Sequence, residues 1–319
     1  MKNISFGIPV STLNSKLFDC GYVTVENGYY VPPIDFDDLY SLLFIGSYHA
    51  PMLHFKKNMT CLWYKTTSFL DFDTLEKAAL DFVVLANCYF KVHRNGFGKV
   101  VRLSYLPALS MRKSIKPNVY VQLTENNQEL IEFEAGEVIH LKEYSVNQDI
   151  YGIPQYIGGI QSILLNHESS LFRRRFYENG GHIGYILVSN DANISQDTAK
   201  KIQEVLSTSK GRTLTSMYIN IPKSSSKEPI KVIPINNKTV KDEFYKIKEI
   251  TESELCACHR IPASLAAIMP NSKGSFLSIK KQLKLYHTLE VPALQQVFIR
   301  INDFIRREVI QFDSFDKGF

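Results

Sequence analysis

The stretch YGIPQYIGGIQSILLNHESSLFRRRFYENGGHIGYIL, residues 151–187, contains the change of pattern that decides the fold class. Its apolar residues recur at spacings of three and four from Ile160 and Ile163 to Phe172, which predicts a long helix. Asn179-Gly-Gly is a typical helix stop, and the IGYILVS run after it is typical of a strand. The sequence therefore predicts a helix that joins two differently built regions.

The region before this helix combines helices with strands. Residues 33–48 and 74–92 have helical spacing and predict two largely buried helices, the second capped by Asp73 or Thr74. Residues 99–145 are rich in β-branched residues that alternate with polar ones, and turn signals separate the runs. We therefore expect an antiparallel meander there.

The region after this helix begins with a small insertion. Residues 183–235 predict a strand, a helix capped by Ser195, and two further strands. Residues 239–259 then have one broad apolar face and predict an amphipathic helix that ends before Pro262. The small α/β unit is thus expected to lie between two long helices.

The last part of the chain predicts two helical segments. They cover residues 276–289 and 293–311, and Pro292 separates them because proline clashes with the preceding turn and removes a hydrogen-bond donor. Together these patterns predict an α+β fold.

The composition is that of a folded, soluble protein. The chain has 319 residues, enough for about two domains, and 45% of them are hydrophobic and 22% charged. The net charge of +5 permits contact with nucleic acid but lacks the strongly basic stripe that would indicate it. No run approaches the roughly 18 apolar residues of a membrane span, and the first residues lack a signal-peptide core. We expect neither membrane insertion nor export.

The cysteines favour a reducing compartment, because they are odd in number and scattered, unlike the disulfide framework of small secreted domains. They are Cys20, Cys61, Cys88, Cys256 and Cys258.

The stretch CACHRIP, residues 256–262, raises the question of a metal or thiol site. On a helix, Cys256 and Cys258 lie about 200° apart and cannot face one ion. Only Cys256 with His259 could do so, and structural zinc needs four ligands. We expect Cys258 to pack in the apolar stripe, and His259 and Arg260 to close the helix as cations. Phosphate-loop, nucleophile-elbow and zinc-protease motifs are missing from the sequence, which weakens every enzyme interpretation.

Two polar stretches have two interpretations each. Arg173-Arg-Arg is the densest basic run, and such runs are usually solvated or salt-bridged faces. Asn271-Ser-Lys-Gly-Ser lies between prolines and suits a mobile finger as well as an ordinary connection.

Several irregular strings resemble the PBSX-type portal proteins of tailed bacteriophages in order and spacing, over nearly the full length of the chain. Besides residues 151–187, they are YYVPPIDFDDL (29–39), HFKKNMT (54–60), INNKTVKDEFYKIKEITESELCACHRIPASLAAIMPNSKGSF (235–276) and LEVPALQQVFIRINDFIRREVIQF (289–312). The RRRFYENGGHIGYIL and HRIP strings are the most specific, since they combine unlike residue types.

The sequence departs from the pattern of that family at three positions. Ala86 stands before Asn87 where the family usually has a glycine, and Ala263 and Ala267 replace a usual proline or glutamine-like residue and a glycine. These changes put the local loop shape in doubt.

The resemblance implies a portal-type α+β fold with an α/β wing, a helical stem, a small α/β clip insertion and a kinked channel helix. The expected divisions are 1–158 for the wing, 159–180 for the first stem helix, 181–236 for the clip, 237–261 for the second stem helix, and 262–319 for the channel loop, the kinked helix and the return to the wing.

The resemblance also implies a function without catalysis. Portal proteins form a ring, usually a dodecamer, at the unique capsid vertex, and double-stranded DNA passes through it during packaging and ejection. The implied partners are further copies of the chain, DNA without sequence specificity, terminase, and the capsid, scaffold and neck proteins, with no cofactor and no membrane. The implied location is the virion of a phage or prophage, with the host cytoplasm during assembly.

Candidate functional residues follow from the same resemblance. The channel loop would contain Asn271, Ser272, Lys273, Gly274 and Ser275, with Lys273 touching the phosphate backbone. Lys280 and Lys281 would supply further phosphate contacts, and Ser224, Ser225, Ser226 and Lys227 of the clip would face terminase.

Two other classes of function stay open at this point. One is a metal- or thiol-dependent enzyme centred on Cys256, Cys258 and His259, and the other is a monomeric DNA-binding adaptor.

Overall fold

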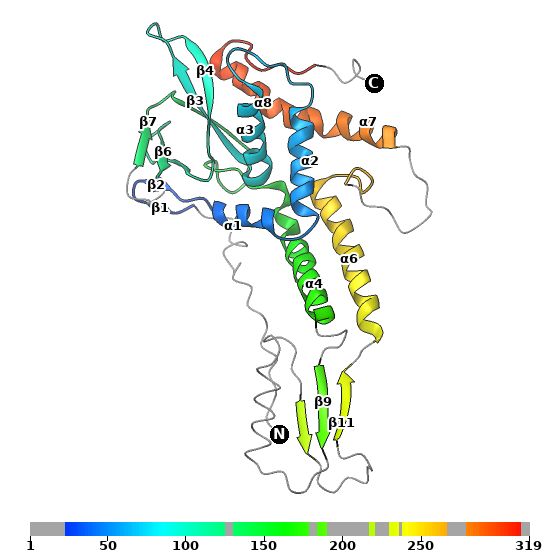
Figure 1. Ribbon diagram of the computed structural model, residues 1–319. Helices are drawn as coiled ribbons and strands as arrows, with labels where there is room; N and C mark the ends of the chain where they lie inside the picture. Colours follow the sequence, from blue (N-terminus) through cyan, green and yellow to red (C-terminus); the bar gives the residue numbers. More distant parts are fainter. Residues whose placement is uncertain are drawn as a thin grey trace. The chain divides into compact units, whose positions relative to one another are not determined.

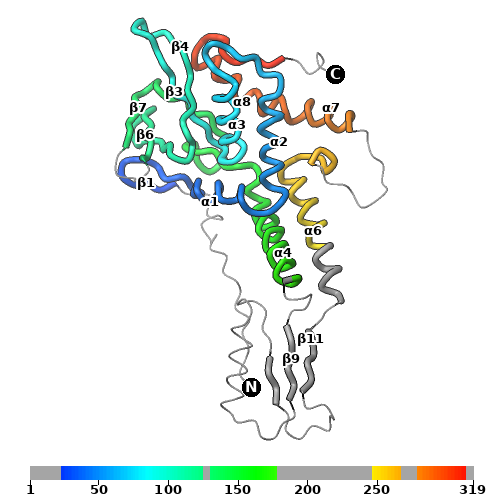
Figure 2. The backbone as a smooth tube through the Cα atoms, in the orientation of Figure 1, coloured from blue at the N-terminus to red at the C-terminus, as the bar shows by residue number. Residues whose placement is uncertain are grey.

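The chain forms two compact units, one of residues 1–163 with 252–319 and one of residues 164–251. The computed structural model describes residues 23–124, 130–178, 184–189, 217–220, 230–235, 238–266 and 279–313. Figures 1 and 2 trace them. Two helices, α4 (Ile160–Glu178) and α6 (Lys238–His259), contribute residues to both units. The divisions into wing, stem, clip and channel loop stay a prediction.

The first helix is shorter than residues 33–48. Helix α1 (Phe36–Ser41) starts where Asp35 accepts a hydrogen bond from the Asp37 backbone N–H at 3.0 Å, and the 3-10 helix η2 (Leu42–Phe44) follows it. The next helix, α2 (His49–Cys61), lies outside the sequence prediction. Its buried face includes polar residues, so the apolar spacing is weak.

Helix α3 (Phe72–Leu85) is capped by Asp71, which accepts a hydrogen bond from the Thr74 N–H at 2.7 Å, so the prediction of Asp73 or Thr74 as the cap is wrong. The prediction that this helix continues to Val92 is also wrong. It ends at Leu85, and strand β3 (Asn87–Arg94) follows. Because β3 is buried on both faces over most of its length, it lacks the alternation that marks a strand in sequence.

Unit 1 contains two antiparallel sheets of three strands each, in the orders β4-β3-β8 and β5-β6-β7. The predicted antiparallel pairing is confirmed, but the strands do not form one meander. Strand β3 is the central strand of the first sheet and pairs with both β4 and β8, so β8 returns to this sheet after β5, β6 and β7. The short strands β1 (Val25–Glu26) and β2 (Tyr29–Tyr30) form a separate hairpin. The remaining strands are β4 (Val100–Leu106), β5 (Met111–Lys113), β6 (Tyr120–Leu123), β7 (Leu130–Phe133) and β8 (Val138–Lys142).

The main core of unit 1 lies where α3 and α8 (Val291–Ile305) pack on the β4-β3-β8 sheet. Phe82 of α3 and Phe298 of α8 meet edge to face with ring centroids 5.8 Å apart. Burying side chains of this size contributes about 2–3 kcal/mol each. The buried members of this core include Leu75, Ala78, Phe82, Phe90, Leu103, Ile139, Leu141, Phe298, Ile301 and Ile310.

Unit 2 contains a small sheet in the order β10-β9-β11. Strand β9 (Gly184–Ser189) pairs in parallel with β10 (Met217–Asn220) and antiparallel with β11 (Ile230–Ile235). The three strands expected in this insertion are confirmed, and the helix expected after Ser195 lies outside the described residues.

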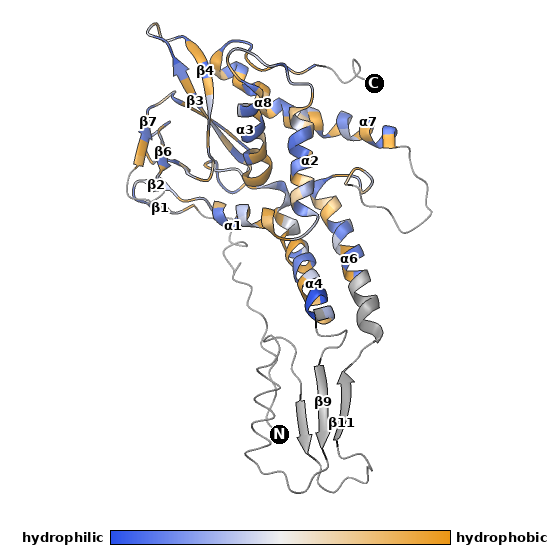
Figure 3. Ribbon diagram, in the orientation of Figure 1, coloured by the Kyte–Doolittle hydropathy of each residue, from blue (hydrophilic) through white to orange (hydrophobic). Residues whose placement is uncertain are grey.

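The break at Pro292 is confirmed, since helix α7 (Ile279–Leu289) ends just before it and Pro292 occupies the first turn of α8. The prediction that the second segment continues to residue 311 is wrong. Helix α8 ends at Ile305, because Arg306 adopts a left-handed φ of 55° and the Asn302 side chain accepts hydrogen bonds from the Val309 and Ile310 N–H groups. Figure 3 shows hydrophilic and hydrophobic residues alternating along α7 and α8. No helix in the described ranges is both long enough and apolar enough to span a bilayer.

The departure at Ala86 has a structural consequence. Ala86 has a φ of 58° in the left-handed region, where glycine is favoured because it lacks a Cβ. We expect Ala86→Gly to raise the free energy of unfolding by about 0.5–1 kcal/mol, measured by urea unfolding with the fluorescence of Trp63, the only tryptophan. The mid-helix change Ala78→Gly should instead lower it by about 1 kcal/mol or more. A loss of stability in Ala86→Gly would contradict the strain argument.

Candidate functional site

Helix α7 presents a basic face to solvent. At 100° per residue, Lys280, Lys281 and Lys284 fall on one side of the helix, and all three are exposed. The helix sequence IKKQLKLYHTL contains no acidic residue that would offset this charge within the helix. Lys280 and Lys281 are candidates from the sequence, and Lys284 joins them in the structure; its i, i+3 and i, i+4 spacings from the other two are the sequence signal that identifies it.

The opposite face of α7 is fixed to unit 1. Tyr286 and His287 are buried, and the Tyr286 ring lies 5.4 Å from that of Phe55 on α2. Gln282 accepts a hydrogen bond from the Ser264 hydroxyl. These contacts hold the helix in one orientation, so the basic face has a defined direction.

The remaining candidate residues belong to the predicted channel loop and clip. Residues 271–275 and 224–227 lie outside the described part of the chain. Arg173, Arg174 and Arg175 are exposed on α4.

The CACHRIP stretch forms the junction between α6 and α2. His259, the last residue of α6, is fully buried, and its Nε2 lies 2.9 Å from Nδ1 of His49 on α2. Tyr156 packs against both imidazole rings and donates a hydrogen bond from its hydroxyl to the Val84 carbonyl at 2.6 Å. Burial lowers the pKa of His49 to about 4 and that of His259 to about 2. The expectation that His259 closes the helix as a cation is wrong, because a buried imidazole is neutral.

The end of α6 is a Schellman motif. The Ile261 N–H donates to the Cys256 carbonyl and the Arg260 N–H donates to the Ala257 carbonyl, both at 3.0 Å, while Arg260 has a left-handed φ of 56°. Arg260 then forms an ion pair with Glu290 at 2.8 Å. The chain therefore turns sharply after α6.

The two cysteines of this stretch lie in surroundings that suppress thiolate formation. Burial raises the pKa of the Cys256 thiol to about 11, and it also raises the pKa of Cys258. Catalytic cysteines and metal ligands need the opposite shift. Cys258 packs against Gly159, where an added Cβ would lie 2.6 Å from its Sγ. Within the described residues, His, Cys, Asp and Glu side chains do not gather in a group of three or more that could hold a metal ion.

The YGIP stretch forms a second junction, between the β4-β3-β8 sheet and the start of α4. The buried Asn87 side chain accepts hydrogen bonds from the Gly152 N–H and His140, both at 2.9 Å. It donates to the carbonyls of Leu85 at 2.7 Å and Gly152 at 3.0 Å. These four hydrogen bonds satisfy the polar groups of the Asn87 side chain, and they hold the segment before α4 against the sheet.

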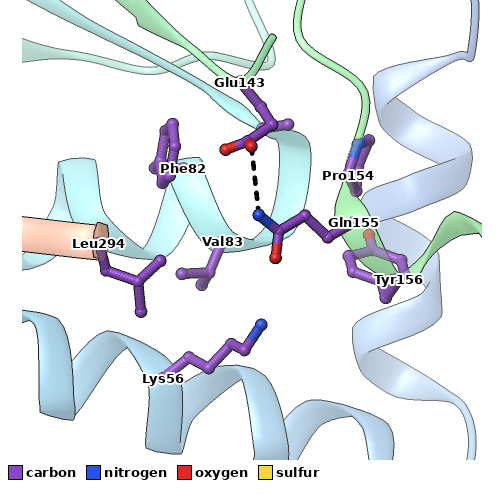
Figure 4. Close-up of a pocket in the computed structure, with 9 residues that line it drawn as sticks. Lys56, Phe82, Val83, Glu143, Pro154, Gln155, Tyr156 and Leu294 are labelled. Atoms are coloured by element: carbon purple, nitrogen blue, oxygen red, sulfur yellow. Dashed lines mark hydrogen bonds between the residues drawn. The ribbon is translucent and has the colours of Figure 1, made fainter. Parts of the chain in front are cut away.

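A buried cation lies between these two junctions. Lys56 of α2 is only 6% exposed and lines a cavity of ≈ 20 Å³. Figure 4 shows its amino group pointing toward Gln155, which donates a hydrogen bond to Glu143 at 3.2 Å. Burial lowers the pKa of Lys56, and the negative charge of Glu290 is the largest influence that opposes this shift. The cavity is large enough for about one water molecule.

Known proteins match most of the chain, including both junctions and α7. The family model described as phage portal protein matches residues 67–316. The chain belongs to the phage portal protein family. A probable portal protein of Escherichia phage P2 is 32% identical to this portal protein over 317 residues, which cover 99% of this chain and 92% of the relative. A probable portal protein of Haemophilus phage HP1 is 33% identical over 310 residues, covering 91% and 89%.

Solved structures confirm the portal-type α+β fold. A chain from the neck of a native gene transfer agent particle, computed with C12 symmetry, is 13% identical with a TM-score of 0.61, and the match covers 88% of this portal protein and 85% of that chain. An HK97 family phage portal protein from Corynebacterium diphtheriae is 12% identical with a TM-score of 0.54, covering 86% and 94%. At these identities the likeness shows the fold alone.

Proposed function

We propose that this portal protein assembles into a ring, a dodecamer, at one vertex of the capsid and conducts double-stranded DNA in and out of the virion. The proposal includes docking of terminase and of the capsid, scaffold and neck proteins, assembly in the host cytoplasm, and membership of the PBSX-type branch. The names of the phage relatives and the C12 symmetry of the gene transfer agent neck support it. The chain would act as a conduit without catalysing a reaction.

The single observation that carries the DNA part of the proposal is the basic face of α7, made of Lys280, Lys281 and Lys284. These three side chains offer positive charge without the fixed hydrogen-bond pattern that would read bases. Such a face can hold a duplex by its phosphates and still let it slide, because the interaction is independent of sequence. The segment that directly precedes α7 contains the proposed channel-loop residues Asn271, Ser272, Lys273, Gly274 and Ser275.

We expect the triple change Lys280→Ala, Lys281→Ala and Lys284→Ala to weaken binding of random-sequence duplex DNA at low salt. The slope of log K against log salt concentration should become shallower by up to about three, since each lost phosphate contact removes nearly one released counterion. Fluorescence anisotropy over a salt series measures this, and negative-stain microscopy of the same samples reports whether rings form.

A matched control is available on α3. Lys77 is exposed and forms an i, i+4 ion pair with Asp73 at 2.6 Å, so Lys77→Ala should leave the salt slope unchanged. An unchanged slope in the triple variant would refute the DNA-contact role of α7. Single molecules at every concentration, without annular particles, would refute the ring and favour a monomeric DNA-binding adaptor.

The enzyme alternative has no support from the geometry of Cys256, Cys258 and His259. The His259 imidazole faces His49 instead of either thiol, and the pKa of both thiols is raised. A nucleophilic cysteine would need a nearby base and a lowered pKa.

A further inference from the structure

A cleft of ≈ 200 Å³ opens beside the two junctions, between the end of β8, Arg260 and the part of α8 from Ala293 to Arg300. It shares Glu143, Gln155 and Leu294 with the small cavity that contains Lys56. The cleft and the small cavity are therefore adjacent, and Lys56 lies next to the cleft.

The cleft carries an excess of positive charge. Four basic side chains line the cleft and the small cavity, against the carboxylates of Glu143 and Glu290, and Lys142 is already paired with Asp149 at 2.7 Å. Arg260 is already paired with Glu290, whereas the amino group of Lys56 and the guanidinium of Arg300 form no ion pair or hydrogen bond with the described residues. The four cations are Lys56, Lys142, Arg260 and Arg300.

The surroundings of these cations favour a carboxylate over a DNA backbone. Glu143 and Glu290 would repel a polyanion that covered the whole cleft, but a single carboxylate can reach Arg300 without approaching both. The apolar side chains of Ala293 and Val297 line the same cleft. Tyr144, which is 79% exposed, also lines it. Exposed aromatic and apolar groups next to arginine are typical of protein interfaces.

The chain itself presents an acidic element that fits this description. The turn between β7 and β8 carries Glu134 and Glu137, with the small residues Ala135 and Gly136 at its tip. The backbone N–H of Glu134 donates to the Glu137 carboxylate at 2.9 Å, which shapes the turn. The Glu134 residue is exposed, and its carboxylate forms no hydrogen bond or ion pair with the described residues. Leu130 and Ile131 on the adjoining edge strand β7 are 42% and 50% exposed, so apolar surface accompanies the charge.

This turn cannot reach the cleft of its own chain. The turn precedes the first residue of β8 and the cleft begins at the last, and β8 is five residues long. At about 3.3 Å per residue, the five steps from Glu137 of the turn to Lys142 of the cleft span about 16 Å, well beyond the reach of a glutamate side chain. Only another copy can bring the turn to the cleft.

We propose that in the ring the Glu134 turn of one copy enters the cleft of the next copy and that its carboxylate binds Arg300. Two different surfaces meet in such a contact, which makes it heterologous, and a heterologous contact repeated by rotation closes a ring. The inference rests on the proposed ring assembly and names one of its contacts.

Charge exchange tests this contact. Arg300→Glu and Glu134→Arg should each raise, by about tenfold or more, the protein concentration at which half the molecules are in rings, because like charges then face each other. The double variant should recover most of the loss. Mass photometry over a dilution series gives the distribution, and the exposed Lys99→Glu on the β3–β4 turn is the control that should assemble like the wild type.

Each failure has a different meaning. Wild-type protein that forms no rings overturns the proposed function itself. Rings of unchanged stability in Arg300→Glu overturn the cleft contact and leave the ring standing, and so does a double variant that recovers nothing. Intact rings with weaker DNA binding in Arg300→Glu would assign the cleft to phosphate and would also overturn the proposal. Thermal unfolding of each variant separates loss of assembly from loss of fold.

Discussion

Gly152→Ala is expected to lower the free energy of unfolding of this portal protein by about 3 kcal/mol or more. An added Cβ would lie 2.2 Å from the Ala86 carbonyl oxygen and 2.7 Å from the Glu143 backbone nitrogen. The Glu143 N–H donates a hydrogen bond of 3.0 Å to the Ala86 carbonyl, and the added methyl group would clash with both atoms of this bond. Both are backbone atoms and cannot turn aside as a flexible side chain would. Overpacking of this kind costs about 1–3 kcal/mol, and the broken hydrogen bonds of Asn87 add to that cost.

The control for this prediction lies six residues further along the same stretch. An added Cβ at Gly158 would meet nothing within 4 Å, so Gly158→Ala should change the free energy of unfolding by no more than about 0.5 kcal/mol. Urea unfolding followed by Trp63 fluorescence measures both variants. Equal stability of the two alanine variants would show that the sheet and the start of α4 can separate there without cost.

Local chemistry explains which elements the sequence could predict. Proline is tolerated in the first turn of a helix and disrupts its interior, so Pro292 can begin α8 but cannot continue α7, and the division between them follows from one residue. The span of α4 follows from its apolar spacing. Strand β3 was mistaken for helix because its residues are buried on both faces, and that burial depends on α3, β4 and β8 together.

The candidate sites also divide into those that a local sequence pattern predicts and those that depend on segments distant in sequence. The lysines of α7 are recognisable from sequence because residues three and four apart share a helix face. The contact of His259 with His49 joins residues 210 positions apart, and no local pattern carries that information. The sequence therefore predicts His259 as a cation that closes the helix, whereas the fold places it at a buried junction. The cleft near Arg300 depends in the same way on segments that are distant in sequence.

The buried histidines at the α2–α6 junction should make the stability of the protein depend on pH. The folded-state pKa of His49 is about 4, below its usual value of 6.5, so between these values the unfolded state binds a proton that the folded state excludes. The free energy of unfolding should therefore fall as the pH falls from 6.5 to 4, by about 3 kcal/mol from His49 at about 1.4 kcal/mol per unit. His259, with a pKa of about 2, adds an effect of the same sign.

Asp81 acts in the opposite direction over part of the same range. Burial raises its pKa from 3.8 to about 6, so the folded state takes up a proton first and gains stability as the pH falls toward 3.8. The free energy of unfolding as a function of pH is therefore the sum of a histidine effect and an Asp81 effect that have opposite signs. The contribution of the histidine junction is isolated only by comparing variants that keep Asp81.

His49→Phe isolates that contribution, because phenylalanine keeps an aromatic ring against Tyr156 and cannot be protonated. We expect its curve of unfolding free energy against pH to be flatter than the wild-type curve by about one proton between pH 6.5 and 4. Urea unfolding with Trp63 fluorescence at half-unit pH steps measures both curves. His54 lies on the same helix α2 but is exposed, so His54→Phe should leave the wild-type slope unchanged. If the His49→Phe and wild-type curves run parallel, His49 takes up its proton equally in both states and the junction does not exclude it.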